Sequence, residues 1–120
     1  MLFRSKTQFK TLSLNVIPDT TCDGGVDTCT DSLAKPWTST SKYGFGYNMA
    51  GDDIPADFLG STYYRSFPDE SLAENPEVVM SNTNVGRNRQ STVTFKTNIS
   101  GTQPEGTYQT IVQFTATPSY

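Results

Sequence analysis

The chain has 120 residues, a formal net charge of -3 and no histidine, with 34% hydrophobic and 18% charged residues. This balance excludes an intrinsically disordered chain, which combines low hydrophobicity with high charge, and it lacks the basic surface of a nucleic-acid-binding protein. Without histidine, the usual general base and the commonest metal ligand are missing. We therefore expect one domain, residues 1–120, that is not an enzyme and needs no cofactor.

The first ten residues, "MLFRSKTQFK", precede the first clear alternating segment. They are predicted to form an extended N-terminal arm whose Leu2, Phe3 and Phe9 contact a neighbouring subunit, and a frayed terminus is the alternative. The segment lacks the apolar stretch of a signal peptide, and no run in the chain is long enough for a membrane helix. We favour a piece of a longer precursor over a cytosolic chain with reduced cysteines.

Residues 11–16 alternate between polar and apolar side chains. Leu12, Leu14 and Val16 share one face, which predicts a half-buried strand that ends at Pro18.

Cys22 and Cys29 flank a turn that contains two glycines, in "TTCDGGVDTCTD". The glycines would let the chain double back, so we predict a local disulfide; two free thiols are the alternative. A disulfide indicates an oxidising, extracytoplasmic compartment. The surrounding carboxylates could gather a calcium ion, although solvated turn residues are the simpler interpretation; they are Asp19, Asp23, Asp27 and Asp31.

The segment "KYGFGYNMAGDD" alternates rings with glycines. Because side chains alternate across a strand, Tyr43, Phe45 and Tyr47 are expected to lie together. We interpret the rings as core and the bare face at Gly44 and Gly46 as a contact surface for a neighbouring subunit. The alternative is an exposed aromatic platform for sugar rings, as in carbohydrate-binding modules, made of Trp37, Tyr43, Tyr47, Tyr63 and Tyr64.

Three carboxylates follow this segment, Asp52, Asp53 and Asp57. Paired carboxylates can hydrolyse glycosides, but adjacent aspartates are more simply turn formers. Further along, residues 69–75 predict one or two helical turns, and residues 78–80 a short strand. Arg87 and Arg89 indicate a solvated loop rather than a phosphate clamp.

Two strong strand patterns close the chain. One places Val93, Phe95 and Ile99 on one face, and the other aligns Tyr108, Val112, Phe114 and Ala116. They could form a hairpin or cross between two sheets, as in a Greek key. Asn98 begins a formal glycosylation sequon, a triplet that arises often by chance. Together, the patterns predict an all-β fold, an antiparallel sandwich of six to eight short strands.

The last thirty residues contain "GTYQTIVQFTATP" after a penultimate strand. This segment resembles the closing hairpin of secreted bacterial surface proteins with pilin-like or immunoglobulin-like sandwiches. The resemblance implies a structural, adhesive or filament-forming role at the cell surface. We therefore expect an extracellular module that self-associates by β-strand complementation, with no nucleic acid and no membrane insertion. The alternative is a carbohydrate-binding module with surface glycans as partners.

Overall fold

The computed structural model describes residues 1–83 and 88–117, so the predicted loop position of Arg87 lies outside the described residues. The described chain is all-β, as predicted, and its helical residues form one 3₁₀ turn, η1 (Glu70–Leu72), inside the segment predicted to be helical. Asp69 caps this turn by accepting a hydrogen bond from the backbone nitrogen of Ser71. No helix among the described residues has the length and apolarity needed to cross a membrane.

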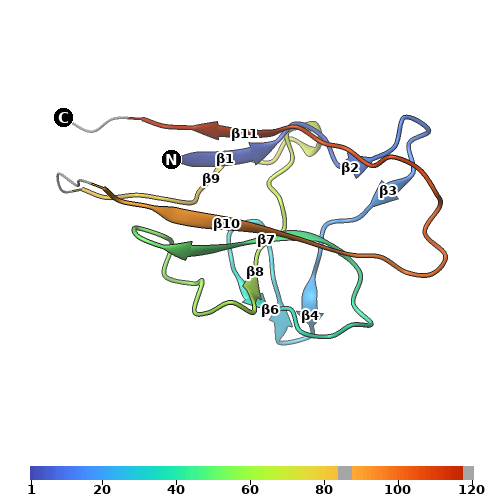
Figure 1. The fold of residues 1–120 in the computed structure, drawn as a ribbon, viewed down its shortest axis with the longest axis horizontal. Helices are drawn as coiled ribbons and strands as arrows, with labels where there is room; N and C mark the ends of the chain where they lie inside the picture. The colour runs from blue at the N-terminus through green and yellow to red at the C-terminus, as the bar shows by residue number, and fades with distance from the viewer. Residues whose placement is uncertain (84–87, 118–120) are drawn as a thin grey trace.

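The strands form several small sheets rather than two continuous ones (Figure 1). One sheet has three strands in the order β11-β1-β9, and the others are the pairs β10-β7, β2-β3, β4-β5 and β6-β8. Many strands are only two residues long, because turns interrupt the expected longer ones. The strands are β1 (Leu2–Ser5), β2 (Phe9–Lys10), β3 (Val16–Ile17), β4 (Cys22–Gly24), β5 (Asp27–Thr28), β6 (Lys35–Pro36), β7 (Gly44–Gly51), β8 (Tyr63–Tyr64), β9 (Glu77–Val78), β10 (Ser91–Asn98) and β11 (Val112–Thr115).

The predicted strand over residues 11–16 is mostly a turn. Leu12 and Leu14 are exposed, and Leu14 has a φ of 65°. The backbone nitrogen of Thr11 donates to the carbonyl oxygen of Asn15, which reverses the chain between β2 and β3. The apolar alternation was therefore misleading here, because only Val16 and its neighbour pair as a strand.

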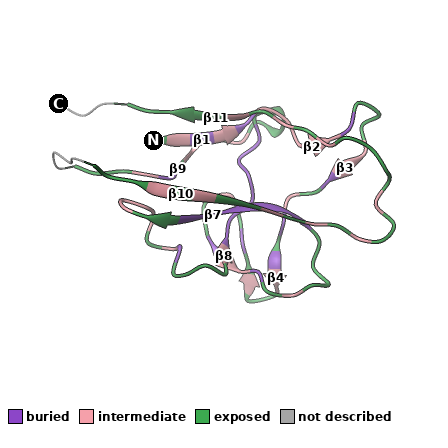
Figure 2. Cartoon of the chain, viewed as in Figure 1, coloured by how far each residue is buried: buried purple, intermediate pink, exposed green. Residues whose placement is uncertain are grey.

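β7 is the central strand of the molecule and is buried along most of its length (Figure 2). One edge pairs with β10 over eight residues. On the other edge, Phe45 bonds with Pro18 and Thr20, and Tyr47 bonds with Arg65 in both directions. β10 is consequently an edge strand of this pairing.

The main core is aromatic and lies between β7 and the β11-β1-β9 sheet. Phe67 stacks on Phe45 with ring centres 4.3 Å apart, and Phe3 lies 4.5 Å from Tyr47 and 5.1 Å from Phe67. The prediction that Phe45 and Tyr47 point into the core is confirmed, since both are buried. Tyr43 precedes β7 and is exposed, so it does not share their environment.

The two closing strands do not form a hairpin. β10 pairs with β7, whereas β11 pairs with β1, so the chain crosses from one sheet to another between them. This is the second of the two predicted connections. It leaves β10 and β11 as edge strands of different sheets.

Candidate functional site

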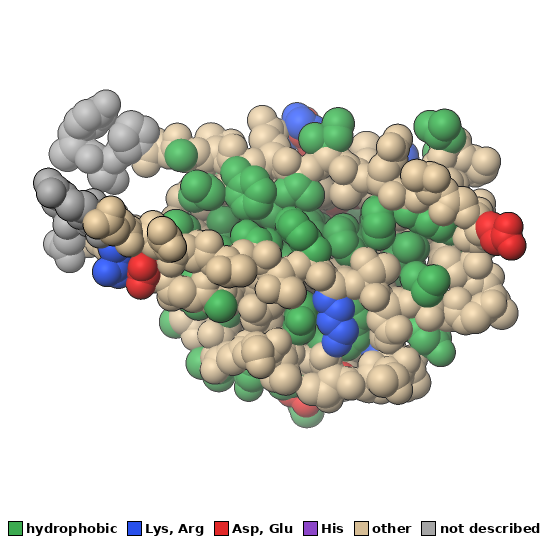
Figure 3. Space-filling view, in the orientation of Figure 1, with side chains coloured by type: hydrophobic (Ala, Val, Ile, Leu, Met, Phe, Trp, Pro, Cys, Tyr) green, Lys and Arg blue, Asp and Glu red, His purple; other side chains and the backbone are tan. Residues whose placement is uncertain are grey.

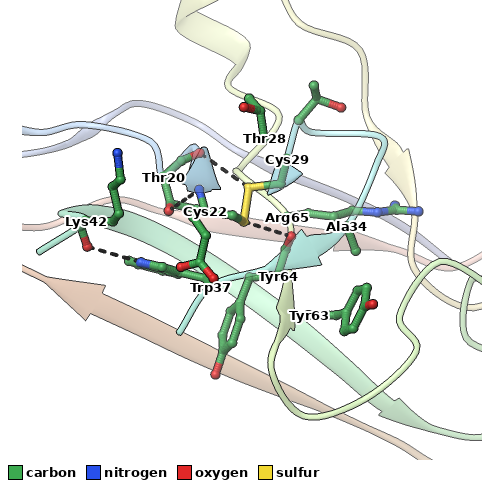
Figure 4. The surroundings of a disulfide bond; sticks show 12 residues. Thr20, Cys22, Thr28, Cys29, Ala34, Trp37, Lys42, Tyr63, Tyr64 and Arg65 are labelled. Carbon is green, nitrogen blue, oxygen red and sulfur yellow. Dashed lines mark hydrogen bonds between the residues drawn. A yellow bond between two sulfur atoms is a disulfide. The ribbon is translucent and has the colours of Figure 1, made fainter. Parts of the chain in front are cut away.

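The predicted disulfide between Cys22 and Cys29 is present, with the two Cα atoms 5.5 Å apart. It ties β4 to the residue after β5 and is buried in a small second core with Trp37 and Tyr64 (Figure 4). The bond is typical of a non-cytoplasmic, oxidising environment. It also gives this loop region a core of its own, separate from the main aromatic core.

Lys96 connects the second core to β10. Its ammonium donates a 2.8 Å hydrogen bond to the carbonyl oxygen of Trp37 and lies 4.3 Å from the centre of the indole ring and 5.1 Å from that of Tyr64. Desolvation lowers the pKa of Lys96, while the carboxylate of Asp23 opposes this change. The ammonium of Lys96 therefore covers the face of the indole ring that a ligand would otherwise contact.

The aromatic platform proposed for sugar binding is not assembled. Trp37 is 1% exposed, with its Nε1 donating to the carbonyl oxygen of Lys42. Tyr47 and Tyr64 are also buried, Tyr63 is half-buried, and Tyr43 is exposed. Tyr63 and Tyr64 are adjacent in β8 and point in different directions (Figure 4). Trp37 and Tyr64 instead belong to the second core, whereas Tyr47 belongs to the main core and Tyr63 packs against it.

The glycine face of β7 is not open to a neighbour. A Cβ on Gly44 would lie 2.6 Å from the Cα of Thr20, and one on Gly46 would lie 2.8 Å from the carbonyl oxygen of Arg65. The glycines do allow a close approach, as predicted, but the approaching segments belong to the same chain. The predicted subunit contact at Gly44 and Gly46 is thus corrected to an internal packing contact.

The aspartates around the cysteines do not converge on a metal. Among residues 1–83 and 88–117, no group of three or more histidine, cysteine, aspartate or glutamate side chains is placed to hold an ion. Asp23 instead accepts hydrogen bonds from the backbone nitrogens of Thr38 and Ser39, which lower its pKa. The calcium candidates Asp19, Asp27 and Asp31 likewise belong to no such group.

Asp19 has a strongly perturbed carboxyl. Burial, together with the nearby carboxylates of Glu74 and Asp69, raises its pKa from 3.8 to about 7. A carboxyl held protonated near neutrality is a common property of functional sites, although structural groups show it as well.

Each carboxylate of the 52–57 turn has a separate structural partner. Asp53 accepts from the guanidinium of Arg89 at 2.9 Å and 3.1 Å. Asp57 accepts from both Nε and Nη2 of Arg65, a largely buried ion pair. Asp52 accepts from the backbone nitrogen of Gln90. Asp52 and Asp53 thus hold two adjacent residues of one segment, Asp57 holds another segment, and each carboxylate is engaged in a structural contact.

The predicted N-terminal arm is instead a strand of the domain. β1 is the middle strand of its sheet, in register with β11 from Leu2 opposite Thr115 to Ser5 opposite Val112. Phe3 is completely buried, and Phe9 packs 4.4 Å from the ring of Phe45. The contacts predicted with a neighbouring subunit are therefore made within the chain: Leu2 pairs in the sheet, and Phe3 and Phe9 pack in the main core.

An apolar strip of the core is uncovered between β10 and β11 (Figure 3). Phe95 on β10 is 49% exposed although it stacks on Phe67 at 5.8 Å. Phe114 on β11 is 45% exposed although it contacts Phe3 at 5.1 Å. We call Val93, Phe95 and Phe114 the open strip.

A pocket of about 340 Å³ forms one end of the open strip. All three methionines of the chain line it, and flexible thioether side chains suit surfaces that accommodate an incoming group. Its lining residues are Met1, Met49, Val79, Met80, Arg89, Gln90, Ser91, Val93 and Phe114. The sequence pattern placed Phe95 and Phe114 on the apolar faces of two strands, and no local signal indicated that the described residues would leave them half exposed.

Comparison of the chain with protein-family models, curated proteins and solved structures found no match in any of the three.

Proposed function

We propose that the protein is an extracellular structural or adhesive module, an antiparallel sandwich of the immunoglobulin-like or pilin-like kind, that assembles with further copies by β-strand complementation. The buried disulfide supports the extracytoplasmic placement. The resemblance of the closing segment to secreted surface proteins supports the structural role.

The observation that carries the proposal is the position of β1 between β9 and β11. In the described residues these two strands do not pair with each other, and each is joined to the sheet only through β1. Phe3 projects from β1 into the aromatic core, where it contacts Tyr47, Phe67 and Phe114. β1 therefore completes both a sheet and a core.

The same strand from a second copy would make the same contacts. β1 is the first element of this sequence and is followed by residues 6–8, which belong to no strand. Exchange of an identical element between copies is a low-cost route to association, and a head-to-tail exchange that does not close extends into a filament. The four backbone pairs with β11 and the burial of Phe3 would be recovered in the exchanged form.

Cysteine trapping tests the exchange directly. Leu2 and Thr115 are opposite each other in the β1–β11 register, at the spacing that a disulfide can bridge. Two single variants, Leu2→Cys and Thr115→Cys, are mixed, unfolded, refolded together and oxidised. Exchange predicts a mixed disulfide dimer, identified by mass, because each chain alone lacks the partner thiol.

The matched control replaces the second variant by Leu59→Cys. Leu59 is exposed and lies in the loop between β7 and β8, which is not part of the β1–β11 pairing. Equal yields of mixed dimer with Thr115→Cys and with Leu59→Cys would contradict strand exchange, as would the absence of any mixed dimer.

A further inference from the structure

The free edge of β10 is unusually well suited to pair with another strand. β10 is eight residues long and pairs with β7 without a break in register. Among the described residues no strand pairs with its other edge. An edge strand of this length presents a row of backbone groups that another chain can use.

β10 lacks the features that normally protect an edge. Its sequence, "STVTFKTN", contains no proline or glycine, and its one charged residue is Lys96. A lysine in an edge strand usually prevents pairing by placing a charge at the edge. Here the ammonium of Lys96 is bound to the carbonyl oxygen and ring of Trp37, so the charge is held against the chain's own second core.

The open strip lies beside this edge and carries no charged side chain. Val93 and Phe95 come from β10, and Phe114 comes from the facing edge of the other sheet. Half-exposed phenylalanines that stack on a buried core are apolar surface that an added strand would cover. Two edges of two different sheets are thus available on one side of the molecule (Figures 1 and 3).

We propose that β10 pairs antiparallel with β10 of a second copy about a twofold axis, and that the open strips of the two copies cover each other. This interface goes beyond the strand exchange of β1 and does not depend on it. Because the one charge of β10 is bound to Trp37, the edge favours a second copy as the occupant, since a self-pairing surface must place identical groups together without like-charge repulsion. The twofold arrangement is also the commonest form of association between identical chains.

The side-chain pattern limits the register of this pairing. Residues 93 and 95 lie opposite Met49 and Tyr47 of β7 and face the main core. Only registers that keep these residues on the core face are allowed, because a one-residue slip would turn them to the other side. We assign the twofold axis to Thr94, which places Thr94 opposite its counterpart and Phe95 opposite Val93 of the second copy.

Two variants that introduce charges of opposite sign at Thr94 test the proposal. Thr94 is exposed, so Thr94→Lys and Thr94→Glu are expected to leave the fold intact, with Trp37 fluorescence as the check. The wild-type protein should dimerise with increasing concentration in analytical ultracentrifugation. Each charged variant should weaken dimerisation at least tenfold, and an equimolar mixture of the two should recover it as a heterodimer.

Several outcomes would overturn the proposal. A wild-type chain that remains monomeric at millimolar concentration would exclude a second copy as the occupant of this edge. Dimers that survive Thr94→Lys, or charged variants that do not recover on mixing, would place the contact elsewhere. Since Thr94 is not in the β1–β11 ladder, these variants should leave the Leu2–Thr115 cysteine trap unchanged, which separates a failure here from a failure of strand exchange.

Discussion

The ammonium of Lys96 on β10 donates to the carbonyl oxygen of Trp37, 59 residues earlier in the chain, and lies over the indole ring. Two residues further along the same face, Asn98 Nδ2 donates to the carbonyl oxygens of Thr40 and Lys42. These contacts attach the edge strand to the disulfide-bonded region. One side of β10 is therefore anchored to its own chain, while its Val93 and Phe95 contribute to the open strip.

Lys96→Met should destabilise the protein by about 1–2 kcal/mol, because it removes one hydrogen bond and a cation–π contact. Urea unfolding followed by Trp37 fluorescence measures the change. Lys42→Met is the matched control at an exposed lysine, with an expected effect within about 0.5 kcal/mol. Equal effects of the two variants would contradict the anchoring role.

Gly46→Ala should destabilise the protein by roughly 1–3 kcal/mol or prevent folding, since the added Cβ meets a backbone oxygen that has little room to move. Its contacts would be 2.7 Å to Thr20 Cγ2 and 2.8 Å to the carbonyl oxygen of Arg65. Gly60→Ala is the control, because a Cβ there meets nothing within 4 Å. Thermal unfolding of the two variants compares them, and similar melting temperatures would show that the β7 glycines are not tightly covered.

Removing the disulfide with Cys22→Ala and Cys29→Ala should cost about 2 kcal/mol, the value expected for so short a loop. The loss should also alter Trp37 fluorescence, because the disulfide and the indole share one core. Mass spectrometry after alkylation, with and without reductant, establishes the bond in the purified protein. If both thiols react without reduction, the extracytoplasmic placement loses its main support.

Stability should fall as the pH rises from 4 to 7, because of Asp19. Burial and the nearby carboxylates of Glu74 and Asp69 raise the pKa of this carboxyl from 3.8 to about 7, so in that range the folded chain retains a proton that the unfolded chain has lost. The folded state then binds more protons, and its stability decreases with increasing pH. Below pH 3.8 both states are protonated and the contribution of Asp19 is fully present.

Asp19→Asn should abolish most of this dependence and stabilise the protein at pH 8 by about 2–4 kcal/mol. Urea unfolding at pH 5 and pH 8 measures the difference for both chains. Glu77 has a pKa that burial raises as well, so a small residual slope is expected in the variant. An identical slope in the wild type and in Asp19→Asn would show that Asp19 is not the responsible group.

The local features of the fold could be read from the sequence where they depend on neighbouring residues. The period-two alternation of Phe45 and Tyr47 predicted their shared burial, and the glycine turn predicted the Cys22–Cys29 bond. The strand predicted from the alternation of Leu12 and Leu14 was wrong, because a side-chain pattern does not show whether the backbone has a strand to pair with. Here the chain turns back, and β2 pairs with β3.

Neither the covering of the β7 glycines nor the exposure of the open strip could be predicted from the sequence, because both depend on contacts between residues that are distant in sequence. Gly44 and Gly46 are covered by Thr20 and Arg65, which no local pattern links to them. Phe95 and Phe114 carry the same strand signal as buried residues. Their exposure results from the placement of β10 and β11 in different sheets.

The most direct test of β-strand complementation is electron microscopy of the concentrated protein with and without a peptide of residues 1–8, "MLFRSKTQ". Assembly through β1 predicts elongated particles that shorten as the peptide competes for the slot between β9 and β11. A peptide with Phe3→Ala should have little effect, because it lacks the side chain that fills the core. Uniform single particles at every concentration, or elongated particles insensitive to the peptide, would contradict the proposal.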